Sequence, residues 1–483
     1  MKTKIYFLAL LSILFIASCD KDFLNTVPNT SINEKDAFTT PKQFLAHVND
    51  MYSQLQNPNY YGGRYIVFNE QRADEFGQND GNAATGSAVW NQNVATTNEY
   101  INDVWAAAYR AINSANILLS QLEKTTVISD SLKKLYSGEA KFVRALCYLN
   151  LVQTYARPYT VDKSSPGVPL RLIAITSSGF NDLARSSVEE VYIQMIKDLD
   201  EAETLLPISQ SSSYYNTIRA RKASAIALKS RVYLNIARYD KVIEECSKIV
   251  SSVAPFTYSN GSTSLALESN LSQVFTGSYT GSESIFSIAF ANSTTETPPS
   301  QFSLAFNYAV QPIIFMAKGG ILKDSVFLNS DDARSKLTGV SKSGGHKILQ
   351  KFIITTAPFR DYVPVMRYAE VLLNYSEALA RNGNTLLSVE ILNAIRHRSN
   401  SKYQFPSEAT SSSDALINTI LNERRIELLG EGLRLQDLQR LGKNLPAKTG
   451  SIGTAPEVPV TAKNYIWPIP SGELSTNKLC TPN

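Results

Sequence analysis

The chain has 483 residues, of which 43% are apolar and 19% are charged, and its formal net charge at pH 7 is +4. A chain of this length and apolar content buries a large core, so the composition excludes an intrinsically disordered protein. The small net charge excludes the basic excess with which nucleic-acid-binding proteins contact many phosphates, so we expect no nucleic acid among its partners.

The first nineteen residues have the pattern of a bacterial secretory signal. Lys2 and Lys4 precede an apolar run at residues 6–16, and a small-residue cleavage site ends in Cys19. The apolar run is shorter than the ~20 residues that span a membrane. We therefore predict a signal peptide at residues 1–18 and a lipid-modified Cys19, whose acyl chains anchor the domain to a membrane. An ordinary cleaved signal beside a coincidental cysteine is the alternative.

Helical periodicity dominates much of the mature chain. Apolar residues recur at i, i+3, i+4 and i+7 over residues 99–122 and 132–156, which indicates two helices with buried faces. A helix pair is predicted over residues 221–251 and another over residues 363–399, where Gly383 suits the left-handed cap after the first helix. These pairs are similar to tetratricopeptide helix pairs, which bury their faces by stacking on neighbours. The pattern predicts a mainly α fold built from such pairs.

Two polar segments interrupt the helical pattern. Residues 57–98 and residues 252–359 are rich in Ser, Thr, Gly, Asn and aromatic side chains, with short β-favouring runs such as residues 284–289. Recognition residues usually lie on loops that a rigid scaffold positions. We therefore expect the ligand to bind at these two segments, and the second half of the chain to be a loop-rich, mixed region packed on the helical spine.

Acidic residues and arginines alternate over residues 422–440, NERRIELLGEGLRLQDLQR. Opposite charges at three- and four-residue steps can meet on a helix, and the arginine fork pairs well with carboxylates. The pattern predicts a buried or semi-buried polar network that fixes helix packing, formed by Glu423, Arg424, Glu427, Glu431, Arg434 and Arg440. The alternative interpretation makes two of the carboxylates a catalytic acid and base, as in glycoside hydrolases.

The usual sequence signals of catalysis and metal binding are not found. The three histidines are far apart, and no HExxH or GxSxG motif occurs. After Cys19 the cysteines are Cys147, Cys246 and Cys480, which form no CxxC pair, so neither a disulfide framework nor a zinc site is indicated. Cys147 and Cys246 are predicted to be buried thiols. We expect a non-enzymatic protein without a cofactor or metal.

The polar stretch GSAVWNQNVATTN, which contains Trp90, follows RADEFGQNDGN. An aromatic ring stacks on the apolar face of a pyranose, while amides and carboxylates bind the sugar hydroxyls. This stretch therefore predicts a sugar site formed by Asp74, Asn79, Asp80 and Trp90. Aromatic residues of other loops are further candidates, with loop packing as the alternative interpretation: Tyr60, Tyr61, Tyr279 and Tyr308.

Five segments together resemble the SusD/RagB family of surface nutrient-binding lipoproteins. They are SCDKDFLNTVP, DVWAAAYRAINSANILL, VPVMRYAEVLLNYSEALARNG, INTILNERRIELLGEGLRLQDLQRLG and NYIWPIP. They occur in the family's order and span nearly the whole chain. Asp20 and Asp22, directly after Cys19, also resemble the surface-export signal of Bacteroidetes lipoproteins.

The resemblance implies a SusD-like α-superhelix of four tetratricopeptide-like pairs in one domain at 19–483, with an N-terminal part at about 20–230 and a C-terminal part at about 250–483. It implies a protein anchored by lipid to the outer membrane and exposed at the cell surface. Its expected partners are an oligosaccharide, or a peptide as in RagB-like relatives, and a SusC-like TonB-dependent transporter. A surface glycoside hydrolase and a protein-binding scaffold remain as alternatives.

Overall fold

The computed structural model describes residues 37–483, apart from residues 178, 262, 277–278 and 329–330. The predicted signal peptide and the predicted lipidation site at Cys19 lie outside the described residues.

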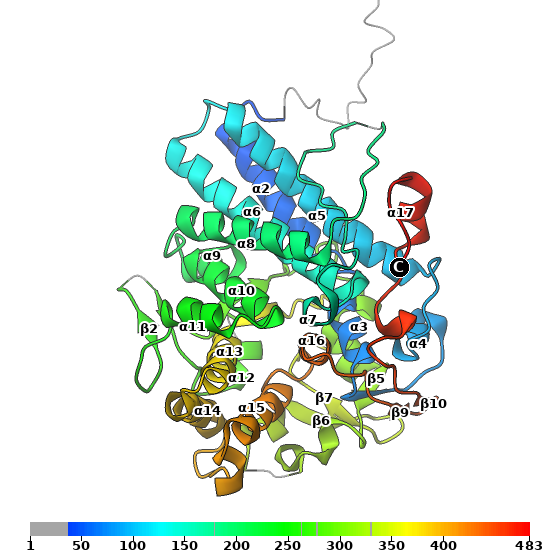
Figure 1. The fold of residues 1–483 in the computed structure, drawn as a ribbon, viewed down its shortest axis with the longest axis vertical. Coiled ribbons are helices and arrows are strands. Elements are labelled where there is room, and N and C mark those ends of the chain that lie inside the picture. Colours follow the sequence, from blue (N-terminus) through cyan, green and yellow to red (C-terminus); the bar gives the residue numbers. More distant parts are fainter. Residues whose placement is uncertain (1–36, 178, 262, 277–278, 329–330) are drawn as a thin grey trace, which may run out of the picture.

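Long helices that follow one another in the sequence lie side by side and form the body of the molecule (Figure 1). They are α2 (Pro41–Leu55), α5 (Glu99–Lys124), α6 (Asp130–Tyr155), α8 (Val188–Leu205), α10 (Lys222–Asn235), α11 (Tyr239–Ser247), α13 (Tyr368–Arg381), α14 (Thr385–Ser399) and α15 (Ser413–Glu427). Helix α5 packs on α2 and α6, α6 on α8, and α8 on α10; α11, α14 and α15 then pack on α13. The predicted helix pairs are therefore confirmed.

Local sequence explains where these helices begin and end. The side chain of Asn98 accepts a hydrogen bond from the first turn of α5, and Ser187 and Glu190 form a capping box at the start of α8. Gly383 follows α13 with a φ of 88°, a left-handed conformation that glycine adopts without a steric penalty. The start of α5, the start of α8 and the end of α13 therefore follow from capping residues that the sequence displays.

Shorter elements surround the helical array. The helices are α3 (Arg64–Arg72), α4 (Ser87–Trp90), α7 (Tyr159–Asp162), α9 (Ser213–Ile218), α12 (Ser272–Phe275), α16 (Arg434–Arg440) and α17 (Ser471–Thr476). The strands are β1 (Phe76–Gln78), β2 (Tyr258–Ser259), β3 (Ser264–Leu265), β4 (Ser284–Ile288), β5 (Ile314–Met316), β6 (Thr338–Val340), β7 (Lys347–Leu349), β8 (Val363–Arg367), β9 (Lys448–Gly450) and β10 (Gly453–Ala455). The mainly α fold with a loop-rich, mixed second half is thus confirmed.

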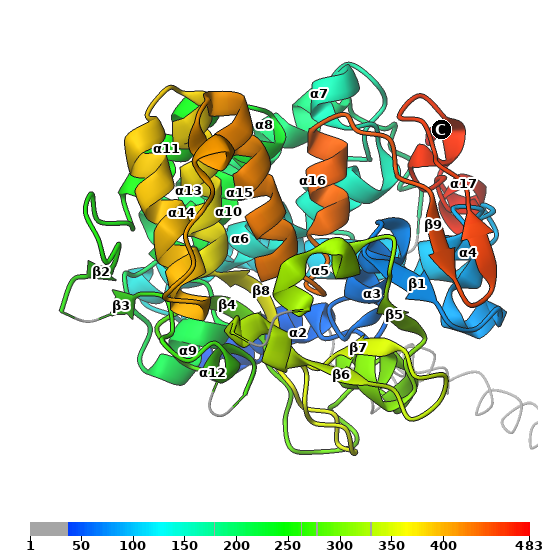
Figure 2. The ribbon, with the colours of Figure 1, turned by 90° about the horizontal axis from the view of Figure 1, so that it is seen from below.

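Antiparallel strand pairs join segments that are far apart in the sequence. Strand β1 pairs with β5, with Phe76 opposite Met316 and Gln78 opposite Ile314, and β4 pairs with β8. The N–H of Ser451, just after β9, donates to the carbonyl oxygen of Gln78 at 2.8 Å. Figure 2 shows β1, β5, β6 and β7 near α3, on one side of the array. The two polar segments are therefore held together by backbone hydrogen bonds.

Aromatic side chains and thiols fill the core between the helices. Trp105 and Tyr368 are buried, and the ring of Trp467 in the C-terminal tail packs against Tyr155, with 5.9 Å between ring centroids. Cys147 and Cys246 are buried and free, as predicted. Within residues 37–483, excluding the short gaps, none of the helices is both long and apolar enough to cross a membrane.

Candidate ligand-binding site

A cleft of 930 Å³ opens where the two polar segments meet. One wall comes from residues 64–85 and the other from residues 301–356. Both stretches lie within residues 57–98 and 252–359, where the sequence predicts the ligand. Ligand sites usually measure about 300–1,000 Å³, so this cleft has a suitable size.

Amides and hydroxyls dominate the polar lining of this cleft, which we call the loop cleft. An amide offers both donors and an acceptor, and a hydroxyl offers one donor and two acceptor lone pairs. Such groups match a ligand that is itself rich in hydroxyls or amides. The polar uncharged residues are Asn79, Asn82, Thr85, Gln301, Asn307, Gln311, Ser341, Ser343, Gln350, Thr355 and Thr356.

The first wall is held rigidly by its own side chains. Asn79 Nδ2 donates to the carbonyl oxygen of Pro312 at 3.1 Å, which joins this wall to the other. Asp80 Oδ1 accepts from the N–H of Asn82 at 2.8 Å, and Asn82 Oδ1 accepts from the N–H of Ala84 at 2.9 Å. Side-chain bonds of this kind stabilise tight turns. The predicted residues Asn79 and Asp80 therefore lie together on the cleft wall.

A π-helical turn at Phe306–Val310 forms part of the second wall. Such turns are rare and often lie at functional sites. The buried side chain of Asn307 donates to the carbonyl oxygens of Gln301 and Ser303 at 3.2 and 2.7 Å, which holds the turn. The half-buried ring of Phe306 borders the cleft. Sequence reasoning singled out the neighbouring Tyr308 and missed Phe306, because no pattern in this segment distinguishes an inward ring from an outward one.

The structure corrects the role predicted for four aromatic residues. Trp90 has no exposed surface, and its Nε1 donates to the carbonyl oxygen of Phe76 at 3.1 Å. Tyr60 and Tyr61 are buried and accept hydrogen bonds from Asn150. Tyr308 is 1% exposed. A ring enclosed by the core offers no face to a ligand, so the loop-packing alternative describes Tyr60, Tyr61 and Tyr308, and the burial of Trp90 was not anticipated.

Two other candidates lie outside the cleft lining. The carboxylate of Asp74 forms two hydrogen bonds with Arg434, at 2.8 and 2.9 Å. Burial raises the pKa of Asp74, but the Arg434 guanidinium outweighs this effect, and the pKa is lower than usual. The ring of Tyr279 stacks on Tyr362 with 4.5 Å between centroids, and its hydroxyl donates to Asp361 at 3.0 Å. Both side chains therefore have protein partners away from the cleft.

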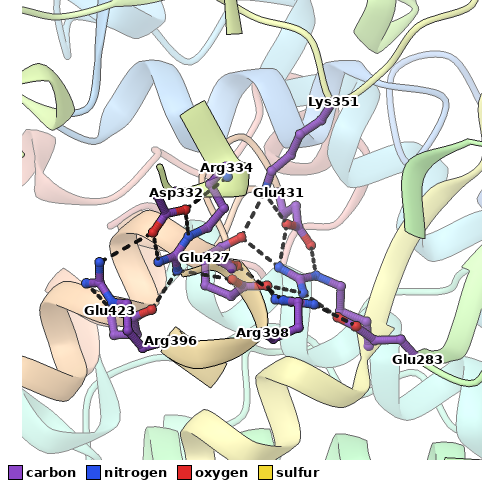
Figure 3. Close-up of polar contacts among 11 residues, drawn as sticks. Glu283, Asp332, Arg334, Lys351, Arg396, Arg398, Glu423, Glu427 and Glu431 are labelled. Atoms are coloured by element: carbon purple, nitrogen blue, oxygen red, sulfur yellow. Dashed lines mark hydrogen bonds and ion pairs between the residues drawn. The ribbon is translucent and has the colours of Figure 1, made fainter. Parts of the chain in front are cut away.

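A buried ion-pair network joins α15 to the loop-rich region (Figure 3). It contains five carboxylates and five cations, so its formal charge is zero, and each of these side chains is at most 5% exposed. Its members are Glu283, Asp332, Arg334, Lys351, Arg367, Arg396, Arg398, Glu423, Glu427 and Glu431. We call it the ten-residue network.

Glu427 is central to the ten-residue network. Its carboxylate contacts Arg367 at 2.7 Å, Arg334 at 3.3 Å and Arg398. Burial alone raises the pKa of Glu427, but the charges of these arginines reverse the effect and hold the pKa well below its usual range. The carboxylate is therefore fixed in its ionised form.

The remaining residues of the predicted charge pattern pair near α16. Arg424 contacts Asp437 at 3.1 Å, and Arg440 contacts Glu377 at 2.6 Å. Burial raises the pKa of Asp437, but Arg424 and Arg440 outweigh it and lower the pKa to about 2. The predicted polar network is confirmed, with one difference: most partners come from other segments and not from the same helix.

A catalytic interpretation of these carboxylates finds no support in the geometry. Glycoside hydrolases use two carboxyl groups that flank the scissile bond. Glu423, Glu427 and Glu431 are committed to buried cations and do not line the loop cleft. Among the described residues that line it, Asp80 is the single carboxylate.

A cluster of three acids resembles a metal site by its composition. The carboxylates of Asp200, Glu203 and Glu245 lie within 4.8 Å of one another. The ammonium group of Lys229 lies between them, 2.9 Å from both Asp200 and Glu245 and in contact with Glu203. This buried lysine supplies the positive charge that a metal ion would otherwise provide.

Comparison with known proteins assigns the chain to a family. Residues 22–234 match a family model described as starch-binding associating with outer membrane, and residues 350–483 match the model of the SusD family. A SusD superfamily protein from Bacteroides fragilis is 31% identical, with a TM-score of 0.83 over 92% of this chain and 100% of that one. SusD-like protein P2 from Formosa agariphila is 25% identical over all of this chain and 99% of its own.

A more distant structure is that of a laminarin binding SusD-like protein. It is 22% identical, with a TM-score of 0.69 over 92% of this chain and 99% of that one, and this similarity shows a shared fold. The family models and the Bacteroides fragilis structure support one assignment. The chain belongs to the SusD/RagB family.

Proposed function

We propose that this protein is a non-catalytic lipoprotein of the cell surface that binds an oligosaccharide in the loop cleft and delivers it to a SusC-like TonB-dependent transporter in the outer membrane. The observation that carries the proposal is the convergence of two distant polar segments on one amide-rich cleft. The half-buried ring of Phe306 offers a face for a pyranose, and Asn79 and Asp80 offer polar partners for its hydroxyls.

The family assignment supports the ligand class and the location. One matching family model is described as starch-binding associating with outer membrane, and one structure of the same fold is that of a laminarin binding SusD-like protein. Membrane anchoring through Cys19 rests on the signal pattern of the first nineteen residues, and the transporter partner rests on the sequence resemblance. Binding without turnover agrees with the single carboxylate, Asp80, among the described residues of the cleft lining.

Isothermal titration calorimetry with soluble glycans and peptides tests the ligand class and the site. We expect at least one oligosaccharide to bind without being shortened, and Phe306→Ala to weaken binding about 2- to 12-fold, because an aromatic contact contributes about 0.5–1.5 kcal/mol. Tyr215→Ala is the matched control, since this ring is 41% exposed and lies outside the cleft.

Three outcomes would contradict the proposal in different ways. Shortened glycan products would show an enzyme. Binding of peptides but not glycans would make the protein a peptide-capturing, RagB-like relative. Normal glycan binding by Phe306→Ala and Asn79→Ala would place the site outside the loop cleft.

A further inference from the structure

Arg64, the first residue of α3, brings a buried positive charge to the loop cleft. The residue is 4% exposed and belongs to the cleft lining. Its Nη1 donates to the carbonyl oxygen of Ala84 at 2.9 Å, while its Nε has no hydrogen-bond acceptor. The guanidinium carbon lies 4.7 Å from the ring centroid of Phe302 and 5.0 Å from that of Tyr100. The protein therefore surrounds this cation with rings and one backbone carbonyl.

Among the described residues, the polar partner of the Arg64 guanidinium is the carbonyl oxygen of Ala84, and no carboxylate forms an ion pair with it. By contrast, every cation of the ten-residue network contacts at least one acid. A buried charge without a counter-charge is costly, and an anion that reaches it reduces that cost. Arg72 and Arg221 are also buried without an ion pair, but neither of them borders the cleft.

The other charges of the cleft lining are Asp80 and Lys342. Asp80 is exposed, and its Oδ1 is engaged by the N–H of Asn82. With Arg64 and Lys342, the lining therefore carries two positive charges and one negative charge. This balance favours a ligand with negative charge over a neutral one.

We propose that the loop cleft takes an acidic oligosaccharide, whose carboxylate or sulfate group binds the guanidinium of Arg64. This inference rests on the proposed function and narrows its ligand class. The planar guanidinium presents donors in a fork that matches the oxygens of both anions, whereas a neutral sugar offers no such partner. The amide of Gln311, which also lines the cleft, can bind hydroxyl groups of the same ligand.

Titration with three probes tests the inference: neutral laminari-oligosaccharides, oligogalacturonates that carry carboxylates, and carrageenan oligosaccharides that carry sulfates. We expect one acidic probe to bind tighter than the neutral one. Arg64→Gln should weaken binding of the acidic probe by roughly 10- to 100-fold, because hydrogen bonds to charged groups contribute that much, and should weaken binding of the neutral probe much less. Lys402→Gln matches the change in net charge at an exposed position outside the cleft and should have no effect.

The outcomes separate this inference from the proposed function. If the neutral probe binds and the acidic probes do not, the inference is wrong and the proposed function stands. The same holds if Arg64→Gln weakens the binding of all probes equally. If Lys342→Gln removes the preference for acidic over neutral probes and Arg64→Gln does not, Arg64 is not the residue that binds the anionic group. If no glycan binds, the proposed function itself fails.

A salt titration of the unmodified protein keeps the test decisive if Arg64→Gln does not fold. Binding of the acidic probe should weaken as salt rises from 50 to about 500 mM, because screening reduces the attraction between charges, while binding of the neutral probe should not. Arg64→Lys, which keeps the charge but loses the fork, should retain part of the preference. Equal salt dependence for both probes would overturn the inference.

Discussion

Glu427→Gln tests whether the ten-residue network stabilises the fold. The side chain is completely buried and contacts three arginines, so the substitution leaves one positive charge without compensation. Breaking a buried ion pair costs about 3–5 kcal/mol. At about 2.1 cal/mol/K of unfolding entropy per residue, a folded region of roughly 450 residues unfolds with about 0.95 kcal/mol/K, so the melting temperature should fall by about 3–5 °C.

Differential scanning calorimetry of both proteins measures this shift. Glu244→Gln is the control, because Glu244 is 54% exposed in its ion pair with Lys241, and an exposed pair of this kind contributes at most ~1 kcal/mol. The arginines hold the pKa of Glu427 below its unfolded value, so its contribution to stability is complete above about pH 4.5 and is lost as the pH falls further. The difference in melting temperature between the original protein and Glu427→Gln should therefore become smaller in acid. An unchanged melting temperature at pH 7 would refute the reasoning.

Three further substitutions give distinct expectations. Burial raises the pKa of Glu70 to about 8, so ionisation of Glu70 destabilises the fold as the pH rises from about 4.5 to 8. Glu70→Gln should therefore melt at the same temperature as the original protein near pH 5 and at a higher temperature at pH 9. Identical melting curves of the two proteins at pH 9 would contradict this. Trp90→Phe should lower the free energy of unfolding in urea by about 1–3 kcal/mol, since it leaves the carbonyl oxygen of Phe76 unpaired, but should leave glycan affinity unchanged. Cys19→Ser should move the protein from the membrane to the soluble fraction after cell lysis, and persistent membrane attachment would count against lipidation.

The helical half of the fold could be predicted from the sequence because its signals are local. The apolar stripe over residues 99–122 lies within α5, and the glycine expected to cap α13, Gly383, does so. The strand predicted near residues 284–289 is β4. The charge pattern around Glu427 also indicated burial correctly, although periodicity could not identify Arg334 and Arg367 as its partners, since both come from distant segments.

The candidate site could be predicted only in part, because it depends on contacts between distant segments. Asn79 and Asp80 reach the cleft through the pairing of β1 with β5, which no local pattern specifies. Trp90 lies in a stretch with the composition of a loop, yet its ring is covered by the core, and Lys448 lies 5.4 Å from the ring centroid. The orientation of a ring in a polar segment is decided by tertiary packing, so composition indicated the segments that line the cleft but not the burial of the individual aromatic rings.

The separation between the ten-residue network and the loop cleft has an evolutionary consequence. Among the described residues, no member of the network lines the cleft. Substitutions at positions such as Gln311 and Thr356 alter the groups presented to the solvent without disturbing the charges that hold the halves together. Residues of the cleft wall can thus be substituted one at a time during evolution while the buried ion pairs of the scaffold are retained.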